Sequence, residues 1–211
     1  FDLSPDGSFI VYSAKLSSGK EFALHTDSKL YRYDVATSKT TELPGLSGYD
    51  GNPRISPDGK TLAFTAMPTD GFESDVNQLH LLDLSTLGAQ PRRIDVAGEY
   101  VNDLKWVGPT SMVLNVTQEA SNQLIRLELK GAKATVTPLT SGDFDFGGFD
   151  YAGKILVAEV EVEDGKAKVL GDCRIAGVPG TGSKIMLNFA GTAGSSTGKL
   201  LPTGNIIDTI V

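Results

Sequence analysis

The sequence is poor in the side chains that most often build metal and redox sites. Its 211 residues include only one cysteine, Cys173, and two histidines, His25 and His80. A single cysteine excludes an internal disulfide framework and a cysteine-built metal site. Neither histidine has a second histidine at ligand spacing, so we interpret both as ordinary strand or loop residues. The sequence therefore predicts no metal site and no cofactor.

Long apolar segments and an excess of positive charge are also missing. No run approaches the ~20 apolar residues that span a bilayer, so no membrane partner is predicted. No signal peptide opens the chain, although a leader could have been removed, and the compartment stays open between cytoplasm and periplasm. The formal net charge is -7, whereas nonspecific nucleic-acid binding needs a basic surface. Nucleic acid is therefore excluded as a partner.

What the chain does contain is a turn, Ser-Pro-Asp-Gly, that occurs at residues 4–7 and again at residues 56–59. In such a turn serine hydrogen-bonds the backbone, proline presets φ at the second position, and glycine accepts the positive φ at the exit. Each copy leads into an alternating run, at residues 8–13 and 60–65. Two copies of one unit at a period near 50 residues point to propeller blades or another stacked array.

The remaining strands of each unit follow the same pattern. Alternating runs bounded by turn residues, the signature of strands and hairpins, occur at residues 29–35 and 40–43, 78–84 and 91–94, and 123–129 and 134–137. A third unit replaces the turn with Gly108-Pro109-Thr110, and a fourth begins at residues 148–158. Because no window keeps a helical period, the predicted fold is all-β, an incomplete β-propeller of three to four blades.

The second unit carries a longer insert at residues 67–77, between its second and third strands. Three acids surround one aromatic side chain there, Phe72, which suggests a calcium loop or a peptide-contact loop. The regular ligand spacing of a dedicated calcium loop is missing, so a solvated loop is the favoured interpretation. Trp106 aligns with Leu3 and Ile55 of the other units and is predicted to lie in the blade core.

These residues carry a resemblance to a known family. The two Ser-Pro-Asp-Gly turns, together with the insert from Ala66 through Leu84, resemble the WD40-like propeller blades of the prolyl oligopeptidase (S9) serine peptidases, a blade type shared with TolB. The resemblance covers residues 1–157. It implies a propeller that caps a separate α/β-hydrolase domain and filters the peptides that reach its active site.

The chain changes character near residue 153. Residues 1–153 carry 13 Lys and Arg against 20 Asp and Glu, and 15 of the 16 aromatic residues. Residues 154–211 carry six of each charge and a single aromatic residue, Phe189. Such a shift marks a boundary between two parts of different origin.

The second part resembles another family. Its blocks Gly177-Val178-Pro179-Gly180-Thr181-Gly182 and Thr197 to Asn205 are similar to the PrpF family, the aconitate and methylitaconate isomerases with a diaminopimelate-epimerase-like fold. The resemblance covers residues 158–211 and includes a predicted strand at residues 185–189. We therefore predict a partial propeller at 1–157 fused to a short β segment of diaminopimelate-epimerase-like origin at 158–211.

Two glycine-rich stretches in the second part are candidate sites. Residues 194–198 fit the Gly-x-Ser-x-Gly nucleophile elbow, but no strand precedes them and no histidine follows, so no catalytic residue is assigned. Gly180, Thr181, Gly182 and Ser183 resemble a phosphate loop with its end reversed. Their backbone amides could bind an anion such as a tricarboxylate, and a plain tight turn is the alternative.

The leading functional interpretation is a non-catalytic propeller portion of an S9-type serine peptidase that gates or positions peptide substrates. One alternative is the remnant of a PrpF-type isomerase, which transfers protons on aconitate-like tricarboxylates. Another is a TolB-like scaffold that binds a protein partner. An arc of three blades exposes its edge strands. We therefore expect the chain to belong to a larger assembly, with a peptide, a protein or an α/β-hydrolase domain as partner, or to aggregate alone.

Overall fold

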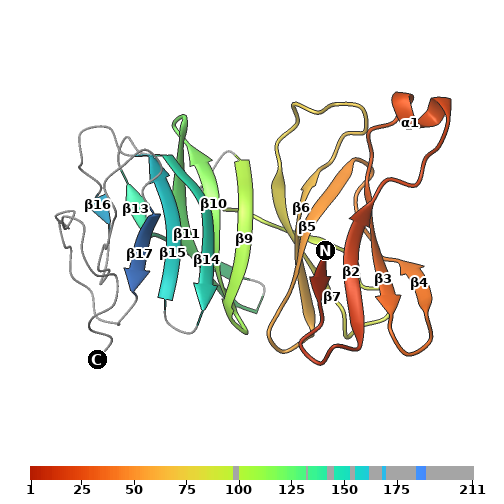
Figure 1. Cartoon of the computed structure of the whole chain (residues 1–211), viewed down its shortest axis with the longest axis horizontal. Helices are drawn as coiled ribbons and strands as arrows, with labels where there is room; N and C mark the ends of the chain where they lie inside the picture. The colour runs from red at the N-terminus through yellow and green to blue at the C-terminus, as the bar shows by residue number, and fades with distance from the viewer. Residues whose placement is uncertain are drawn as a thin grey trace.

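The computed structural model describes residues 1–96, 100–131, 133–141, 145–152, 155–161, 168–169 and 184–188. Over this part the chain is nearly all β, as predicted, and its antiparallel sheets follow one another from the red first sheet to the blue last strand (Figure 1). The sheets formed by the described residues are open and do not close into a ring. The predicted all-β class and the incomplete propeller are confirmed.

Three sheets have four strands each, in simple meander order. The first contains β1 (Asp2–Leu3), β2 (Phe9–Ala14), β3 (Lys29–Asp34) and β4 (Lys39–Glu42), the second β5 (Tyr49–Ile55), β6 (Thr61–Met67), β7 (Gln78–Asp83) and β8 (Arg92–Ile94), and the third β9 (Tyr100–Gly108), β10 (Ser111–Gln118), β11 (Ser121–Lys130) and β12 (Lys133–Pro138). These are the three predicted units. A five-residue helix, α1 (Lys20–Leu24), between β2 and β3 was not predicted, because it is too short to show a helical period.

The fourth sheet draws strands from both predicted parts of the chain. It pairs β14 (Asp145–Ala152) with β15 (Ile155–Glu161), and β15 with β17 (Lys184–Asn188). A separate pair joins β13 (Thr140–Ser141) to β16 (Lys168–Val169). The strand predicted at 185–189 corresponds to β17, which lies beside β15, and residue 189 is outside the described residues. The predicted division at residue 157 falls inside β15. That division stays a prediction.

The repeated turns have the geometry that their residues predict. In the first, Ser4 Oγ accepts from Phe9 N at 3.0 Å, and Gly7 has φ of 70°. In the second, Ser56 Oγ accepts from Thr61 N at 2.9 Å, and Gly59 has φ of 73°. Any residue with a side chain would be strained at either position, because L-amino acids disfavour this left-handed backbone conformation. Both turns lie at the same end of their sheets because each joins the first strand to the second.

The second sheet is buried on both faces. Leu62 and Phe64 of β6 pack in the cluster shared with the first sheet, whereas Ala63 packs in the cluster shared with the third. Burial of both faces explains why the sequence of β6 is a nearly continuous apolar run. A strand with one face in solvent would alternate apolar and polar residues. Trp106 packs against the cluster shared by the second and third sheets. Its indole N–H donates to Arg54 O at 2.9 Å across the junction between these blades. Trp106 was predicted to lie in the blade core, and it lies at the edge of that core.

A polar side chain in the second strand of a blade holds the first strand of the next blade. Ser13 of β2 donates to Asp50 O of β5 at 2.6 Å. The equivalent Asn115 of β10 donates to Phe146 O and Gly147 O of β14 at 2.6 and 2.8 Å. Register shifts interrupt β5 and β14 near the points of attachment. These side chains thus hydrogen-bond backbone carbonyls at or next to the irregular part of each first strand.

Replacing Asn115 with alanine is expected to weaken the junction between the third and fourth sheets. Asn115 is 3% exposed, and its loss would leave buried carbonyl oxygen unpaired, at a cost of about 1–3 kcal/mol. Equilibrium urea unfolding would measure this loss. Asn102→Ala is the matched control because Asn102 is exposed and its side-chain bonds, one of them to Asn115 Oδ1, stay within the third sheet. Equal losses in the two variants would contradict a role of Asn115 in holding β14 against the third sheet.

Candidate functional site at the loops of the first two blades

Two loops at one end of the first two sheets form the candidate site. Both connect a second strand to a third: residues 15–28 join β2 to β3 and contain α1, and residues 68–77 join β6 to β7. In a meander this end lies opposite the Ser-Pro-Asp-Gly turns, and Figure 1 shows both loops at the top. We call residues 15–28 and 68–77 together the insert rim.

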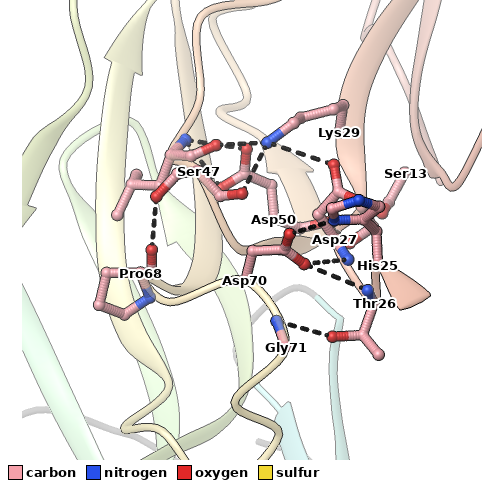
Figure 2. A network of polar contacts seen from close by, with 12 residues as sticks. Ser13, His25, Thr26, Asp27, Lys29, Ser47, Asp50, Pro68, Asp70 and Gly71 are labelled. Atoms are coloured by element: carbon pink, nitrogen blue, oxygen red, sulfur yellow. Dashed lines mark hydrogen bonds and ion pairs between the residues drawn. The ribbon is translucent and has the colours of Figure 1, made fainter. Parts of the chain in front are cut away.

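Asp70 connects the two loops of the insert rim. Its Oδ2 lies 2.7 Å from His25 Nδ1, and its Oδ1 accepts from the backbone N–H groups of Thr26 and Asp27 at 3.1 and 3.2 Å (Figure 2). In return Gly71 N donates to Thr26 Oγ1 at 3.1 Å. One carboxylate from the second blade thus organises three consecutive residues of the first. This arrangement fixes how the two loops sit against each other.

The connector between the first two blades, residues 43–48, is tied to the same network. Ser47 Oγ donates to Pro68 O at 2.7 Å. Lys29 Nζ donates to Leu46 O at 2.7 Å and to Ser47 O at 3.1 Å, and pairs with Asp27 at 3.7 Å. Figure 2 shows these contacts beside the Asp70 cluster. The rim is therefore held by bonds to the connector as well as between its loops.

Oppositely charged side chains of the rim shift each other's pKa values. The Asp70 carboxylate raises the pKa of His25 above its ordinary value, first by the hydrogen bond and then by its charge, and the pKa of Asp70 is lowered by the same bond. Glu21 adds a second acid, 3.2 Å from His25 Nε2. Ligand-type atoms of His25, Asp27 and Asp70 lie within 4.8 Å of one another, close enough to share a cation. Both ring nitrogens already face carboxylates, so the geometry is that of an ion-pair network.

Asp50, next to the rim, is a buried carboxyl. It is 0% exposed, and both of its oxygens accept from the same donor, Leu46 N, at 3.0 and 3.1 Å. Burial raises its pKa to about 6, against the opposing effects of the Leu46 hydrogen bond and the Lys29 charge. Burial disfavours the charged form, so the folded state favours the protonated form of the Asp50 carboxyl.

The residues singled out in the sequence have different outcomes. His80 is an ordinary strand residue, as interpreted: it lies in β7, is 5% exposed, and stacks on Phe64 with ring centroids 5.6 Å apart. Burial lowers its pKa. The insert at 67–77 is a solvent-facing loop, as favoured. Gly180, Thr181, Gly182 and Ser183 lie outside the described residues, as do Cys173 and residues 194–198, so their predicted roles stay predictions.

Sequence reasoning missed the partnership of His25 and Asp70. The two residues are 45 positions apart, and neither belongs to a motif. A signal was available, because both lie in the connection between the second and third strands of consecutive units. Loops at the same place in neighbouring repeats lie side by side once the repeats stack.

The fold defines the class of protein: these are β-propeller blades. Among solved structures, TolB from Acinetobacter baumannii superimposes over 95% of this chain and 45% of its own, with a TM-score of 0.53 and 16% sequence identity. In the part of the chain that is described, no helix is long or apolar enough to cross a membrane.

The relatives are of two kinds. Dipeptidyl-peptidase 5 from Porphyromonas endodontalis is 36% identical over 157 residues, which are 74% of this chain and 22% of that protein. The PrpF protein family model matches residues 150–211, and 3-methylitaconate isomerase from Eubacterium barkeri is 64% identical over 58 residues, 28% of this chain and 15% of that protein. The first part thus resembles S9 peptidase blades and TolB, and the second resembles PrpF. The chain spans under a quarter of each of these two relatives.

Proposed function

We propose that this chain is a non-catalytic propeller portion of an S9-type serine peptidase, which gates or positions peptide substrates. The observation that carries the proposal is the set of three complete four-stranded blades, whose sequence is 36% identical to a dipeptidyl-peptidase over 157 residues. Its partner would be an α/β-hydrolase domain that supplies the catalytic residues. The insert rim is the part of the blades best suited to contact a peptide.

Neither histidine of the blades is placed to activate a serine. In a Ser-His-Asp triad the serine nucleophile needs a histidine within hydrogen-bond reach. His80 is buried against Phe64, and His25 is engaged by Asp70 and Glu21. Each of the two histidines of the sequence thus already has a structural place in the blades.

A second candidate, the isomerase remnant, is favoured by the PrpF match over residues 150–211. That stretch contains Gly180, Thr181, Gly182 and Ser183, whose backbone amides would bind a substrate carboxylate. The segment is 15% of the length of the isomerase that it resembles. We propose that its acid and base would have to come from sequence outside this chain, so that the fragment would bind and not turn over.

Activity assays separate these proposals. Purified chain is incubated with chromogenic dipeptides and, separately, with aconitate, and we expect no turnover of either above the rate of a heat-denatured sample. Binding of an unlabelled peptide, measured by isothermal titration calorimetry, is expected, whereas binding of aconitate in the same measurement would favour the isomerase remnant. Turnover of the dipeptides or of aconitate would overturn the non-catalytic proposal. Binding of a folded protein without any affinity for peptides would favour the TolB-like scaffold.

A further inference from the structure

Exposed apolar side chains gather on the insert rim. Nine large hydrophobic residues are exposed in the described part of the chain, and five of them lie on the rim. They are Leu16 (69%), Phe22 (56%), Leu24 (68%), Phe72 (52%) and Val76 (45%). None contributes to the blade cores, and α1 has no buried residue at all. Apolar side chains concentrated at one end of a fold, rimmed by polar groups, mark an interaction surface.

The rim is also organised before any partner arrives. Asp70 joins its two loops, Gly71 N donates back to Thr26, and Tyr49 OH donates to Glu73 Oε1 at 3.0 Å. Asp75 accepts from Thr69 N at 3.1 Å within the second loop. Because the loops are already held, binding to them would cost less ordering entropy than binding to free segments.

The charge of the second loop selects the partner. Residues 68–77 contain Asp70, Glu73 and Asp75 and no lysine or arginine. Hydrogen bonds lower the pKa of Asp70 and that of Asp75. This loop is therefore negative at neutral pH, with Phe72 between Asp70 and Glu73 in the sequence and Val76 directly after Asp75. On the first loop, Lys15 Nζ lies 4.1 Å from the centre of the Phe22 ring and donates to Phe22 O. A cation stacked on an aromatic residue thus already occurs within the rim.

We propose that the insert rim binds an extended peptide segment in which an apolar side chain stands next to lysine or arginine. This inference rests on the proposed peptide-positioning function and names the class of peptide. The apolar side chain of the peptide would cover Phe72 and Val76, and its cation would face Glu73 and Asp75. Such a complex weakens as salt screens the charges.

The test uses fluorescein-labelled hexapeptides and fluorescence anisotropy with the full chain. The probe has the sequence Gly-Leu-Lys-Phe-Lys-Gly, and its comparison peptide carries glutamate in place of both lysines. We expect the basic peptide to bind at least tenfold more tightly than the acidic one, with affinity falling as salt is raised from 50 to 500 mM. Equal binding of the two peptides would overturn the proposed charge selection.

Two double variants locate the binding surface. Phe72→Ser with Val76→Ser should weaken binding of the basic peptide at least tenfold. Val35→Ser with Leu87→Ser is the matched control, since these exposed residues lie on the turns β3–β4 and β7–β8 at the opposite end, and it should leave binding unchanged. Glu73→Gln should reduce the salt dependence. Thermal melts check that each variant is folded.

The same measurements separate a failure of the rim as the binding surface from a failure of peptide positioning as the function. If the basic peptide binds the wild-type chain and the Phe72/Val76 variant equally, the rim is the wrong surface while peptide positioning stands. If neither peptide binds the wild-type chain, peptide positioning fails and the rim proposal fails with it.

Discussion

Gly48→Ala is expected to disrupt the junction between the first two blades. A Cβ at residue 48 would lie 2.2 Å from Met67 O, 2.8 Å from Thr69 N and 2.9 Å from Pro68 C. All three are backbone atoms at the start of the second rim loop, so no side chain can rotate away to make room. Overpacking of this kind costs about 1–3 kcal/mol or more, and we expect a large fall in the urea midpoint of unfolding.

Gly108 provides the matched control for Gly48. A Cβ at Gly108 would lie 3.5 and 3.6 Å from side-chain atoms of Ser111, which is ordinary contact. Gly108→Ala should therefore change the midpoint little. The rim also provides a second readout, because Gly48→Ala should increase proteolytic cleavage within residues 68–77 under native conditions. A Gly48→Ala chain as stable and as resistant as the control would show that the blades do not pack as described.

Asp50→Asn is expected to remove a large part of the pH dependence of stability in weak acid. Because burial raises the pKa of Asp50 to about 6, folding favours its protonated form. The corresponding stability is fully present below the ordinary aspartate pKa of about 4 and is lost as the pH rises through about 6. A shift of about two pK units corresponds to about 3 kcal/mol. The variant, which cannot ionise, should lose none of this stability.

The measurement is the free energy of unfolding by urea at pH 4, 5, 6 and 7. Wild type minus Asp50→Asn isolates the titration of Asp50. This difference in the free energy of unfolding should fall by about 2 kcal/mol from pH 4 to pH 7, because the unfolded-state carboxyl is already about half ionised at pH 4. Asp95→Asn, at an exposed position after β8, is the control and should follow the wild-type curve. A difference that is flat across this range would contradict a buried, destabilising carboxylate.

Much of the fold was predictable because its signals are local. The Ser-Pro-Asp-Gly turn carries its hydrogen-bond acceptor, its preset φ and its positive-φ residue within four positions. The strand runs around it alternate at the period of a pleated sheet. The third unit was found without the turn, since Gly108 and Pro109 still break the strand where β9 ends and β10 begins.

The candidate site was less predictable because its contacts join distant parts of the chain. Nothing near His25 indicates that Asp70 would face it, and the insert at 67–77 looked like an isolated solvated loop. The burial of Asp50 was equally hidden, since the connector that covers it has no pattern beyond two glycines. At Gly45 a Cβ would lie 1.9 Å from Asp50 Oδ2, a close approach that only the folded connector reveals.

The sequence by itself determined the strands, the turns, the blade repeat and the change of character near residue 153, because turn chemistry and side-chain alternation act over a few neighbouring residues. Only the tertiary structure decided that Asp70 of one blade organises residues 25–27 of another and that Asp50 is buried. It also decided that β17 lies beside β15. These features depend on how successive sheets stack, and stacking brings together residues whose separation along the chain carries no local signal.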